Sequence, residues 1–446
     1  MIPKQNLSRR RFIAGGAALA ALPLLSHSSA AAEVDVVVVG TGAAGLAATR
    51  DLLGRGVSVA ALEASSRVGG RAHTDLALFG VPYDIGAHWL HRAGKNPFVQ
   101  HAKDHGFTAY PAPDTETLYV GDRKATEEEH FAYSAAYENA VRAISVAGRR
   151  GRDVSPASVV PDAGSWHDLV HFAIGPYEMA KDFDAFSCLD WWNSEDGRDF
   201  YCKEGYGALV AHSARGLDVS LSTRVTSIDW SGSGVAVETD RGRIRAKACI
   251  VTVSTGVLAN EDIRFVPALP DEMAEAFHGI SMGVYDHIAL LFDENVLGTG
   301  PDEYLLYNAH THEAHSPALM GLLTNVSGTG LTLADVGGDF AMELENAGGE
   351  AAIDFAKSEL RKIFGAAIDK HLVKAHFTRW GHNTLTRGSY ASALPGAYRL
   401  RSVLRRPVGE RVWFAGEACS TDEWATVAGA HRVGVRVARL VSMAMR

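Results

Sequence analysis

The residues best placed to do chemistry in this chain begin with a glycine-rich turn that could hold a phosphate group. The turn, residues 40–45, reads Gly-Thr-Gly-Ala-Ala-Gly and follows the β-branched run 34–39. Gly40 permits a tight turn, Gly42 lets a pyrophosphate approach the backbone, and Gly45 lets the following helix pack closely on the strand. The N-terminus of that helix would face the phosphate charge. This pattern predicts a strand, a turn and a helix that bind a dinucleotide.

A carboxylate and a second glycine pair sharpen the choice of dinucleotide. Glu63 ends the next predicted strand, 57–62, about 20 residues after the turn, where its carboxylate could accept hydrogen bonds from ribose hydroxyls. An acid at this place disfavours a 2′-phosphate and therefore NADP. In the segment 67–71, Arg-Val-Gly-Gly-Arg, the two glycines allow a second close approach to phosphate and Arg71 adds positive charge. This segment favours FAD over NAD.

Several motifs together resemble those of the flavin-containing amine oxidase family, nearest to its polyamine oxidase branch. The resemblance begins with Glu63, the segment 67–71 and the segment 84–91, which reads Asp-Ile-Gly-Ala-His-Trp-Leu-His. It continues through most of the chain, in 225–230, 248–253 and 256–258 on the adenine side, in Trp380 with 388–390 near the flavin ring, and in 414–419 and 425–430 at the C-terminal flavin-binding strand and helix.

The resemblance implies an α/β fold in which a Rossmann-type FAD-binding domain is interleaved with an α+β substrate domain. The FAD-binding domain would be assembled from 33–95, 204–267 and 380–446, and the substrate-binding domain from 96–203 and 268–379. Within the latter, 159–200 is expected to be partly helical, 285–292 a strand, and 350–364 a helix used for packing.

The motifs and the resemblance together assign a set of residues to the cofactor. They are Gly40, Gly42, Ala43, Ala44, Gly45, Glu63, Ala64, Gly69, Gly70, Arg71, Gly86, Ala87, His88, Trp89, Val225, Trp380, Gly416, Glu417, Thr426 and Val427. Ser389 occupies the position where monoamine oxidases carry a cysteine attached to FAD, so the FAD is expected to be noncovalent.

The resemblance implies that the amine lies over the flavin in an apolar aromatic slot. In that slot Tyr390 matches an aromatic residue of the substrate cage, and Trp380 matches a tryptophan packed near the flavin ring. Thr426 replaces the second cage tyrosine of the monoamine oxidases, as in the polyamine branch. His91 matches a histidine that could hydrogen-bond an amine or tune its protonation, and a structural role is the alternative. Arg92 replaces a usual glycine, and an inward-pointing arginine would favour a carboxylate-bearing substrate.

The largest departure from the family pattern is His287. The family places a lysine there, which holds a water molecule against the flavin. Imidazole is shorter and often neutral, so His287 could still bind water but would not supply the same fixed positive charge for oxygen reduction. The electron acceptor is therefore left open between dioxygen and a periplasmic acceptor such as a cytochrome, and so is a merely structural role for His287.

Composition bounds the remaining possibilities. The chain has 446 residues, 47% hydrophobic residues and a net charge of −9, which are typical of a globular enzyme and make nucleic acid an improbable partner. Its four cysteines show no CxxC spacing, so neither a metal site nor a disulfide framework is predicted, although a bridge between Cys188 and Cys202 is left open. Oligomeric state is also left open, with a homodimer among the options.

The first residues resemble an export signal. Residues 8–13, Ser-Arg-Arg-Arg-Phe-Ile, precede an apolar run over 13–25 and small residues over 28–32. The apolar run is shorter than the roughly 20 residues that span a bilayer, which argues against a retained anchor. Residues 1–32 are therefore predicted to be a twin-arginine signal peptide, read by the twin-arginine export machinery, that sends the protein to the periplasm or outside the cell.

The leading functional hypothesis is oxidation of an amine carbon–nitrogen bond to an imine, which water hydrolyses, with reduction of dioxygen to hydrogen peroxide. Polyamines or related primary and secondary amines are the first candidate substrates. The alternatives are a periplasmic amine dehydrogenase, an L-amino-acid oxidase, a flavin-dependent desaturase or protoporphyrinogen oxidase, and a noncatalytic flavoprotein. A desaturase or protoporphyrinogen oxidase would act at a membrane, and the sequence shows no apolar membrane-binding helix for that purpose.

Overall fold

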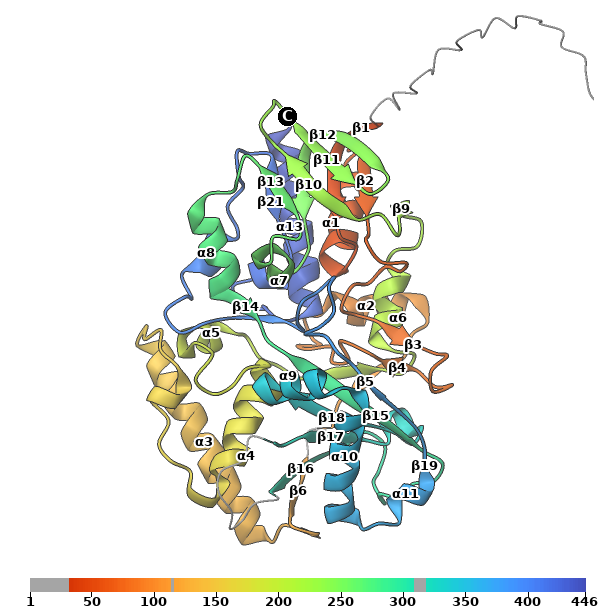
Figure 1. Ribbon diagram of the computed structural model, residues 1–446, viewed down its shortest axis with the longest axis vertical. Coiled ribbons are helices and arrows are strands. Elements are labelled where there is room, and N and C mark those ends of the chain that lie inside the picture. The colour runs from red at the N-terminus through yellow and green to blue at the C-terminus, as the bar shows by residue number, and fades with distance from the viewer. Residues whose placement is uncertain (1–31, 114–115, 309–317) are drawn as a thin grey trace, which may run out of the picture. The chain divides into compact units, whose positions relative to one another are not determined.

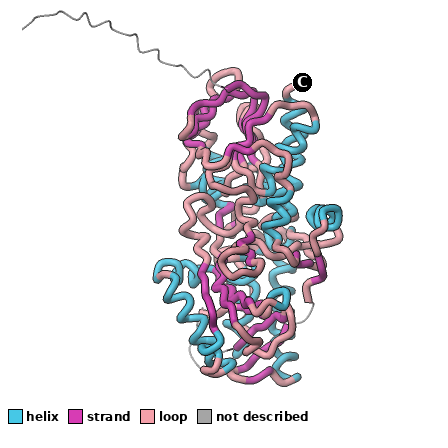
Figure 2. The backbone as a smooth tube through the Cα atoms, turned by 90° about the vertical axis from the view of Figure 1, so that its right-hand side faces the viewer, coloured by secondary structure: helices cyan, strands magenta, loops and turns pink. Residues whose placement is uncertain are grey.

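The computed structural model describes residues 32–113, 116–308 and 318–446 (Figure 1). The predicted signal peptide lies outside the described residues except for Ala32, with which the first strand begins. The stretch from Ala32 to Arg446 forms one compact unit. Figure 2 shows its strands gathered in two groups, with helices and loops around them.

The first sheet has eight described strands and carries the glycine-rich turn. Its central strand β1 (Ala32–Val39) pairs in parallel with β2 (Val59–Leu62) and β12 (Gly242–Val251). Residues 36–38 are fully buried valines, as expected of a parallel strand covered on both faces. The other strands are β9 (Val219–Ser220), β10 (Val225–Asp229), β11 (Val235–Thr239), β13 (Arg264–Val266) and β21 (Val412–Phe414).

Two helices cross closely beside this sheet. They are α1 (Ala43–Gly54) and α13 (Val427–Ala444). A Cβ atom on Gly434 would lie 2.1 Å from the carbonyl oxygen of Ala44, so only glycine allows this approach. The smaller elements near this sheet are α2 (Pro97–His105), α6 (Tyr206–His212), α7 (Thr255–Ala259), α8 (Asp271–Gly279), α12 (Leu400–Val403) and the hairpin of β3 (Thr74–Asp75) and β4 (Tyr83–Asp84).

The second sheet has seven described strands, in the order β19, β15, β18, β17, β16, β6, β7. Their bounds are β6 (Glu116–Val120), β7 (Arg123–Lys124), β15 (Tyr285–Phe292), β16 (Glu303–Asn308), β17 (Gly321–Thr324), β18 (Leu331–Gly337) and β19 (Leu372–Phe377). Adjacent strands in this sheet pair antiparallel, except β16 and β6, which pair in parallel. The strand β15 coincides with the strand predicted over 285–292.

The remaining helices pack mainly with the second sheet. They are α3 (Glu127–Arg149), α4 (His167–Phe172), the π-helical turn Ala173–Tyr177, α5 (Cys188–Asn193), α9 (Gly338–Ala347), α10 (Gly349–Phe364) and α11 (Ile368–His371). Two short strand pairs complete the fold, β5 (Ala109–Pro111) with β8 (Phe200–Cys202) and β14 (Ile280–Met282) with β20 (Ala391–Ala393). On α10 the buried positions Ala352, Ala356, Leu360 and Ile363 recur at helical spacing, as expected of a packing helix.

The strands of the two sheets come from different stretches of the chain. Apart from Ala32, every described residue of the first sheet comes from the stretches 33–95, 204–267 and 380–446, and every described strand of the second comes from 96–203 and 268–379. Each sheet is surrounded by its own cluster of buried apolar side chains.

The bridge between Cys188 and Cys202 is not formed, and all four cysteines are free and buried. The physical reason is that Cys188 lies in the apolar cluster of the second sheet and Cys202 in that of the first. Among the described residues, no helix combines the length and the apolar character needed to cross a membrane.

Candidate active site

A cavity of about 1120 Å³ brings residues of both sheets together. Small-molecule sites usually enclose about 300 to 1,000 Å³, so this cavity has room for a large cofactor and a small substrate. Every residue assigned to the cofactor from the sequence lines it except Gly45. His91, His287 and Tyr390 also line it.

The glycine-rich turn lines this cavity and leads directly into the N-terminus of α1. Gly40 has a φ of +92°, and a Cβ atom on Gly45 would lie 1.9 Å from the carbonyl oxygen of Gly40. Gly45 therefore serves the packing of α1 on the turn. Gly42 precedes α1, and within the described chain no side chain caps this helix and no acid lies in its first turn. The first N–H groups of α1 are thus available to an anion.

Glu63 holds the turn as well as lining the cavity. Its Oε2 atom accepts hydrogen bonds from the backbone N–H of Thr41 at 2.8 Å and from the Thr41 hydroxyl at 3.0 Å. Its Oε1 atom accepts from the backbone N–H of Ser65 at 2.9 Å. The carboxylate is 8% exposed, so a ribose could reach only its remaining lone pairs.

Arg71 and Glu417 tie three segments together at the cavity wall. The Nη1 atom of Arg71 donates to the carbonyl oxygen of Ser389 at 2.8 Å and to Oε1 of Glu417 at 2.9 Å. Glu417 also accepts from the backbone N–H groups of Ala391 and Ala425, at 3.2 and 2.9 Å. Glu417 therefore positions the chain around the cavity, and its charge partly compensates that of Arg71.

The N-terminus of α13 is the second helix end at the cavity. Its first residue, Val427, lines the cavity, and so does Thr426 before it. The hydroxyl of Thr426 accepts from the backbone N–H of Gly429 at 2.9 Å and caps the helix. A helix N-terminus carries partial positive charge, so this end can stabilise negative charge on a bound ligand.

Trp380 is fixed against the segment around Gly86. Its Nε1 atom donates to the carbonyl oxygen of Ile85 at 3.0 Å, and its backbone N–H donates to Oδ1 of Asp286 at 3.0 Å. A Cβ atom on Gly86 would lie 1.8 Å from the carbonyl oxygen of Arg71 and 3.0 Å from the Trp380 ring. Desolvation, followed by the neighbouring Glu345, raises the pKa of Asp286 to about 8.

His88 lines the cavity in the same segment. It is 5% exposed, and its Nδ1 atom lies 3.0 Å from Oδ2 of Asp84. Asp84 also accepts from the backbone N–H groups of Tyr206 and Gly207, at 3.0 and 3.1 Å. His88 is therefore held by a buried carboxylate at the start of α6. Val225, the first residue of β10, also lines the cavity.

His287 is bonded at both ring nitrogens. It is 6% exposed, its Nδ1 atom lies 2.5 Å from Oδ1 of Asp335, and its Nε2 atom lies 3.2 Å from the carbonyl oxygen of Gly86. Burial would lower the pKa of His287, but the charge of Asp335 and the hydrogen bond to it outweigh burial and raise the pKa. The sequence alone predicts an imidazole that is often neutral. Asp335 instead favours the protonated form of His287.

Four tyrosines, Tyr177, Tyr285, Tyr304 and Tyr390, form an aromatic wall of the cavity. They lie in the part built mainly from residues 96–203 and 268–379, which is called the substrate part below. The ring centroid of Tyr177 lies 5.8 Å from that of Tyr285 and 5.4 Å from that of Tyr304. The ring centroids of Tyr285 and Tyr390 are 6.0 Å apart. The Tyr285 hydroxyl donates to Oδ2 of Asp335 at 2.8 Å. Tyr390, predicted as the cage aromatic, is thus one member of a larger wall, which can hold an apolar chain and exclude water.

Acidic side chains also line the substrate part. From residues 96–203 they are Glu116, Glu138, Glu178, Glu195, Asp196 and Asp199, and no described lining residue from that stretch is a lysine or arginine. Desolvation, and then the charge of Asp196, raise the pKa of Glu178 to about 7. This part of the cavity therefore attracts cations.

His91 stands among these acids. Its Nδ1 atom lies 2.9 Å from Oδ2 of Asp199, and 45% of its side chain is exposed. Burial by the surrounding chain would lower the pKa of His91, but the hydrogen bond and the charge of Asp199 raise it.

Arg92 does not offer a free cation to a substrate. Its side chain is 9% exposed, its Nη1 atom donates to Oε1 of Glu423 at 2.7 Å, and its Nη2 atom donates to Glu195. The two carboxylates compensate its charge. Arg92 lines the cavity, and within the described chain its guanidinium is paired with these two carboxylates.

Sequence reasoning missed several cavity residues. They are Tyr177, Glu178, Tyr285, Tyr304 and Trp424. It also missed Asp335, which lies behind the cavity wall and bonds His287 and Tyr285. The aromatic and acidic richness of 159–200 was a usable signal for Tyr177 and Glu178.

Comparison with known proteins places this geometry in context. The chain matches the family described as flavin containing amine oxidoreductase over residues 43–442. It is 29% identical to Polyamine oxidase 4 of Oryza sativa subsp. japonica, covering 94% of this chain and 90% of that protein. It is 30% identical to Polyamine oxidase 2 of Arabidopsis thaliana, covering 90% and 87%. A solved structure of wild-type putrescine oxidase bound to putrescine has the same fold, with a TM-score of 0.74, 22% identity and coverage of 93% and 99%.

Proposed function

The chain belongs to the flavin-containing amine oxidoreductases, and from this we propose that it oxidises a carbon–nitrogen bond of a polyamine or a related cationic amine. FAD would be bound noncovalently, dioxygen would be reduced to hydrogen peroxide, and water would hydrolyse the imine product. The observation that carries the proposal is the set of six carboxylates that residues 96–203 contribute to the cavity wall. Arg92 also lines this wall, where it is paired with Glu195 and Glu423. Both polyamine oxidases and putrescine oxidase are among the proteins it resembles.

The residues present fit FAD. The N–H groups at the start of α1 would hold the pyrophosphate, and Gly42 leaves room because the nearest atoms to an added Cβ are 3.9 Å away. Glu63 would face the ribose, and the N-terminus of α13 would face the polar edge of the ring system. Ser389 uses its hydroxyl on the backbone of Tyr285, at 2.8 Å from its carbonyl oxygen, and offers no thiol for a covalent bond.

When bound, the flavin would supply the redox chemistry by accepting a hydride equivalent from the carbon next to the amine nitrogen. The protein's own part is to bind and orient the amine and to exclude water. The tyrosine wall would align the alkyl chain and exclude water, and the carboxylates would hold the distal ammonium groups. Glu178, whose pKa is raised to about 7, gains its charge as the pH rises through neutrality and would then attract a distal ammonium group.

His287 and Asp335 would assist the oxygen reaction. Asp335 raises the pKa of His287 and so favours the protonated imidazole, at the position where the family pattern has a lysine. A protonated imidazole can stabilise negative charge as dioxygen is reduced. This favours dioxygen over a cytochrome as the acceptor.

The deciding experiment is anaerobic stopped-flow bleaching of the flavin absorbance by a diamine, a triamine, monoamines of matched length and L-amino acids, followed by mixing with air-saturated buffer. We expect the polyamines to bleach fastest and air to restore the colour rapidly. Slow recovery in air would indicate a dehydrogenase. Preference for L-amino acids, or no bleaching by any amine, would overturn the proposal.

We also propose that the protein is exported by the twin-arginine route before it acts. The support is the pattern at 8–13 and the apolar run after it. Replacement of Arg9 and Arg10 by lysine should leave active enzyme in the cytoplasmic fraction. Unchanged export of that variant would contradict the proposal.

A further inference from the structure

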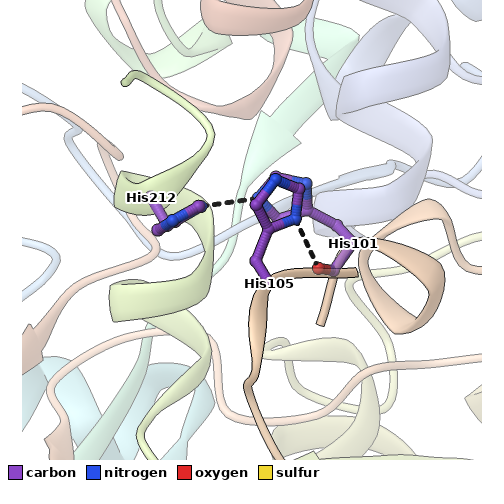
Figure 3. Close-up of side chains that lie close together, drawn as sticks. All are labelled: His101, His105 and His212. Carbon is purple, nitrogen blue, oxygen red and sulfur yellow. Dashed lines mark hydrogen bonds between the residues drawn. The ribbon is translucent and has the colours of Figure 1, made fainter. Parts of the chain in front are cut away.

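Three histidines gather outside the cavity. His101 and His105 lie one turn apart on α2, and His212 is the last residue of α6, which packs against α2 (Figure 3). One ring nitrogen from each histidine lies within 4.8 Å of those of the other two. None of the three is among the described residues that line the cavity, so the amine chemistry leaves them unexplained.

A hydrogen bond fixes which ring nitrogen of His105 could bind a metal ion. Its Nδ1 atom lies 2.9 Å from the carbonyl oxygen of His101 (Figure 3). A carbonyl oxygen only accepts, so Nδ1 carries the proton and Nε2 has a free lone pair. Metal-binding histidines are commonly fixed in this way, with the second ring nitrogen donating to a backbone carbonyl.

The other two rings already meet at a distance close to that between ligands of one metal ion. Nε2 of His101 and Nδ1 of His212 are 3.1 Å apart. Two nitrogens bound tetrahedrally at about 2.0 to 2.1 Å lie roughly 3.4 Å apart, so these rings need to move by only a few tenths of an ångström. Phe98 and Phe107 pack edge-on against His101 and His212 respectively and limit the motion of both rings.

The ligand atoms available in the cluster indicate which class of metal ion could bind. Arg50 donates to the carbonyl oxygens of Ser213 and Arg215, so two guanidinium groups stand near His212, while Asp104 is the nearby acid on α2. No carboxylate belongs to the cluster of possible ligands among the described residues. Calcium and magnesium require oxygen ligands, whereas neutral imidazoles suit zinc, copper, nickel and cobalt.

From this geometry we propose that His101, His105 and His212 form a site for one divalent transition-metal ion of the zinc class, with water in the remaining coordination position. The ion would join α2 to α6. The first of these helices begins beside Asn96, which donates to the carbonyl oxygen of His91, and the second begins at the residues that bind Asp84. The site would thus clamp two helices that support the segment 84–91.

The test is a titration with Co²⁺ of the full-length flavoprotein, prepared without an affinity tag and freed of metal with a chelator. Tetrahedral Co²⁺ absorbs at wavelengths longer than oxidised flavin does, so the two signals separate. We expect one ion per chain, competition by Zn²⁺, and a rise in the melting temperature when metal is added. These readouts do not depend on amine oxidation, so they stand if the proposed function fails.

His105→Ala is the informative variant because His105 is exposed and its loss should not disturb folding. We expect it to weaken metal binding by at least about 100-fold, with flavin content unchanged. The matched control is His278→Ala, which removes an exposed histidine on α8 and should bind metal as the parent does. Equal binding by the parent and His105→Ala, or no binding by the parent above micromolar background, would overturn the site.

Discussion

The two parts of the cavity are built by different means. The cofactor part uses backbone groups, namely the turn at 40–45 and the N-termini of α1 and α13, together with the arginines Arg67, Arg71 and Arg224. The substrate part uses side chains, namely four tyrosines and six carboxylates. Backbone N–H groups at helix N-termini suit an anionic dinucleotide, and carboxylates suit a cationic amine.

The largest effect should come from the backbone-built part. Gly42→Ala adds a methyl group where the protein leaves space, at 3.9 Å from its nearest neighbours, but where the pyrophosphate would lie. Gly42 has a φ of −69°, which alanine accepts. We therefore expect a folded protein whose flavin affinity falls by at least about 100-fold, measured by fluorescence titration of the apoprotein.

Gly45→Ala is the matched control for that prediction. Its Cβ atom would meet the carbonyl oxygen of Gly40 at 1.9 Å, so the variant should lose thermal stability as well as flavin. If Gly42→Ala bound flavin like the parent, the pyrophosphate would not lie against this turn, and the contrast between the two parts would fail.

The next largest effect should come from the acids. Glu178→Gln should lower kcat/KM for a diamine about tenfold and affect a monoamine of the same length less, because one charge attracting the distal ammonium is lost. Glu178 is ionised above its pKa of about 7 and loses its charge as the pH falls through that value. The ratio of parent to variant activity should therefore fall below pH 7.

Glu128→Gln is the control for Glu178, since it removes an exposed acid of α3 that does not line the cavity. Steady-state kinetics across pH and salt would measure both variants. Equal losses for the diamine and the monoamine would mean that Glu178 acts on the reacting nitrogen and not as a cation site.

A smaller effect should appear in the oxygen reaction when Asp335 is changed. Asp335→Asn removes the charge that raises the pKa of His287, and burial then lowers that pKa. His287 should lose its proton at a lower pH, so reoxidation of the reduced flavin by dioxygen at pH 7 to 8 should slow about fivefold. The control is Tyr285→Phe, which removes the hydrogen bond from the Tyr285 hydroxyl to Asp335. It should leave the pH dependence of flavin reoxidation unchanged.

The contrast also explains what the sequence could predict. The cofactor part follows from contiguous motifs, because strand, turn and helix succeed one another within 34–53 and the first and second strands pair directly. The partner of His287 could not be found in this way. Asp335 is its neighbour across β15 and β18, and a register between strands 48 residues apart leaves no local pattern.

The role of Arg92 could not be predicted from the sequence either, although its charge was visible there. Its identity suggested a carboxylate anchor, but its partners Glu195 and Glu423 lie 103 and 331 residues away in the chain and neutralise it. The effect of such a residue depends on partners that only the fold brings near.

The smallest catalytic effect should therefore follow Arg92→Met. We expect the selectivity for amines over L-amino acids to change by less than about twofold, while the free energy of unfolding falls by about 2 kcal/mol because Glu423 loses a buried partner. Glu423 keeps Arg432 at 2.9 Å, which limits that loss. Adding Glu423→Gln to the variant should restore part of the stability. If Arg92→Met instead abolished a strong activity on L-amino acids, Arg92 would be a substrate anchor, and the acidic part of the cavity would not be a cation site.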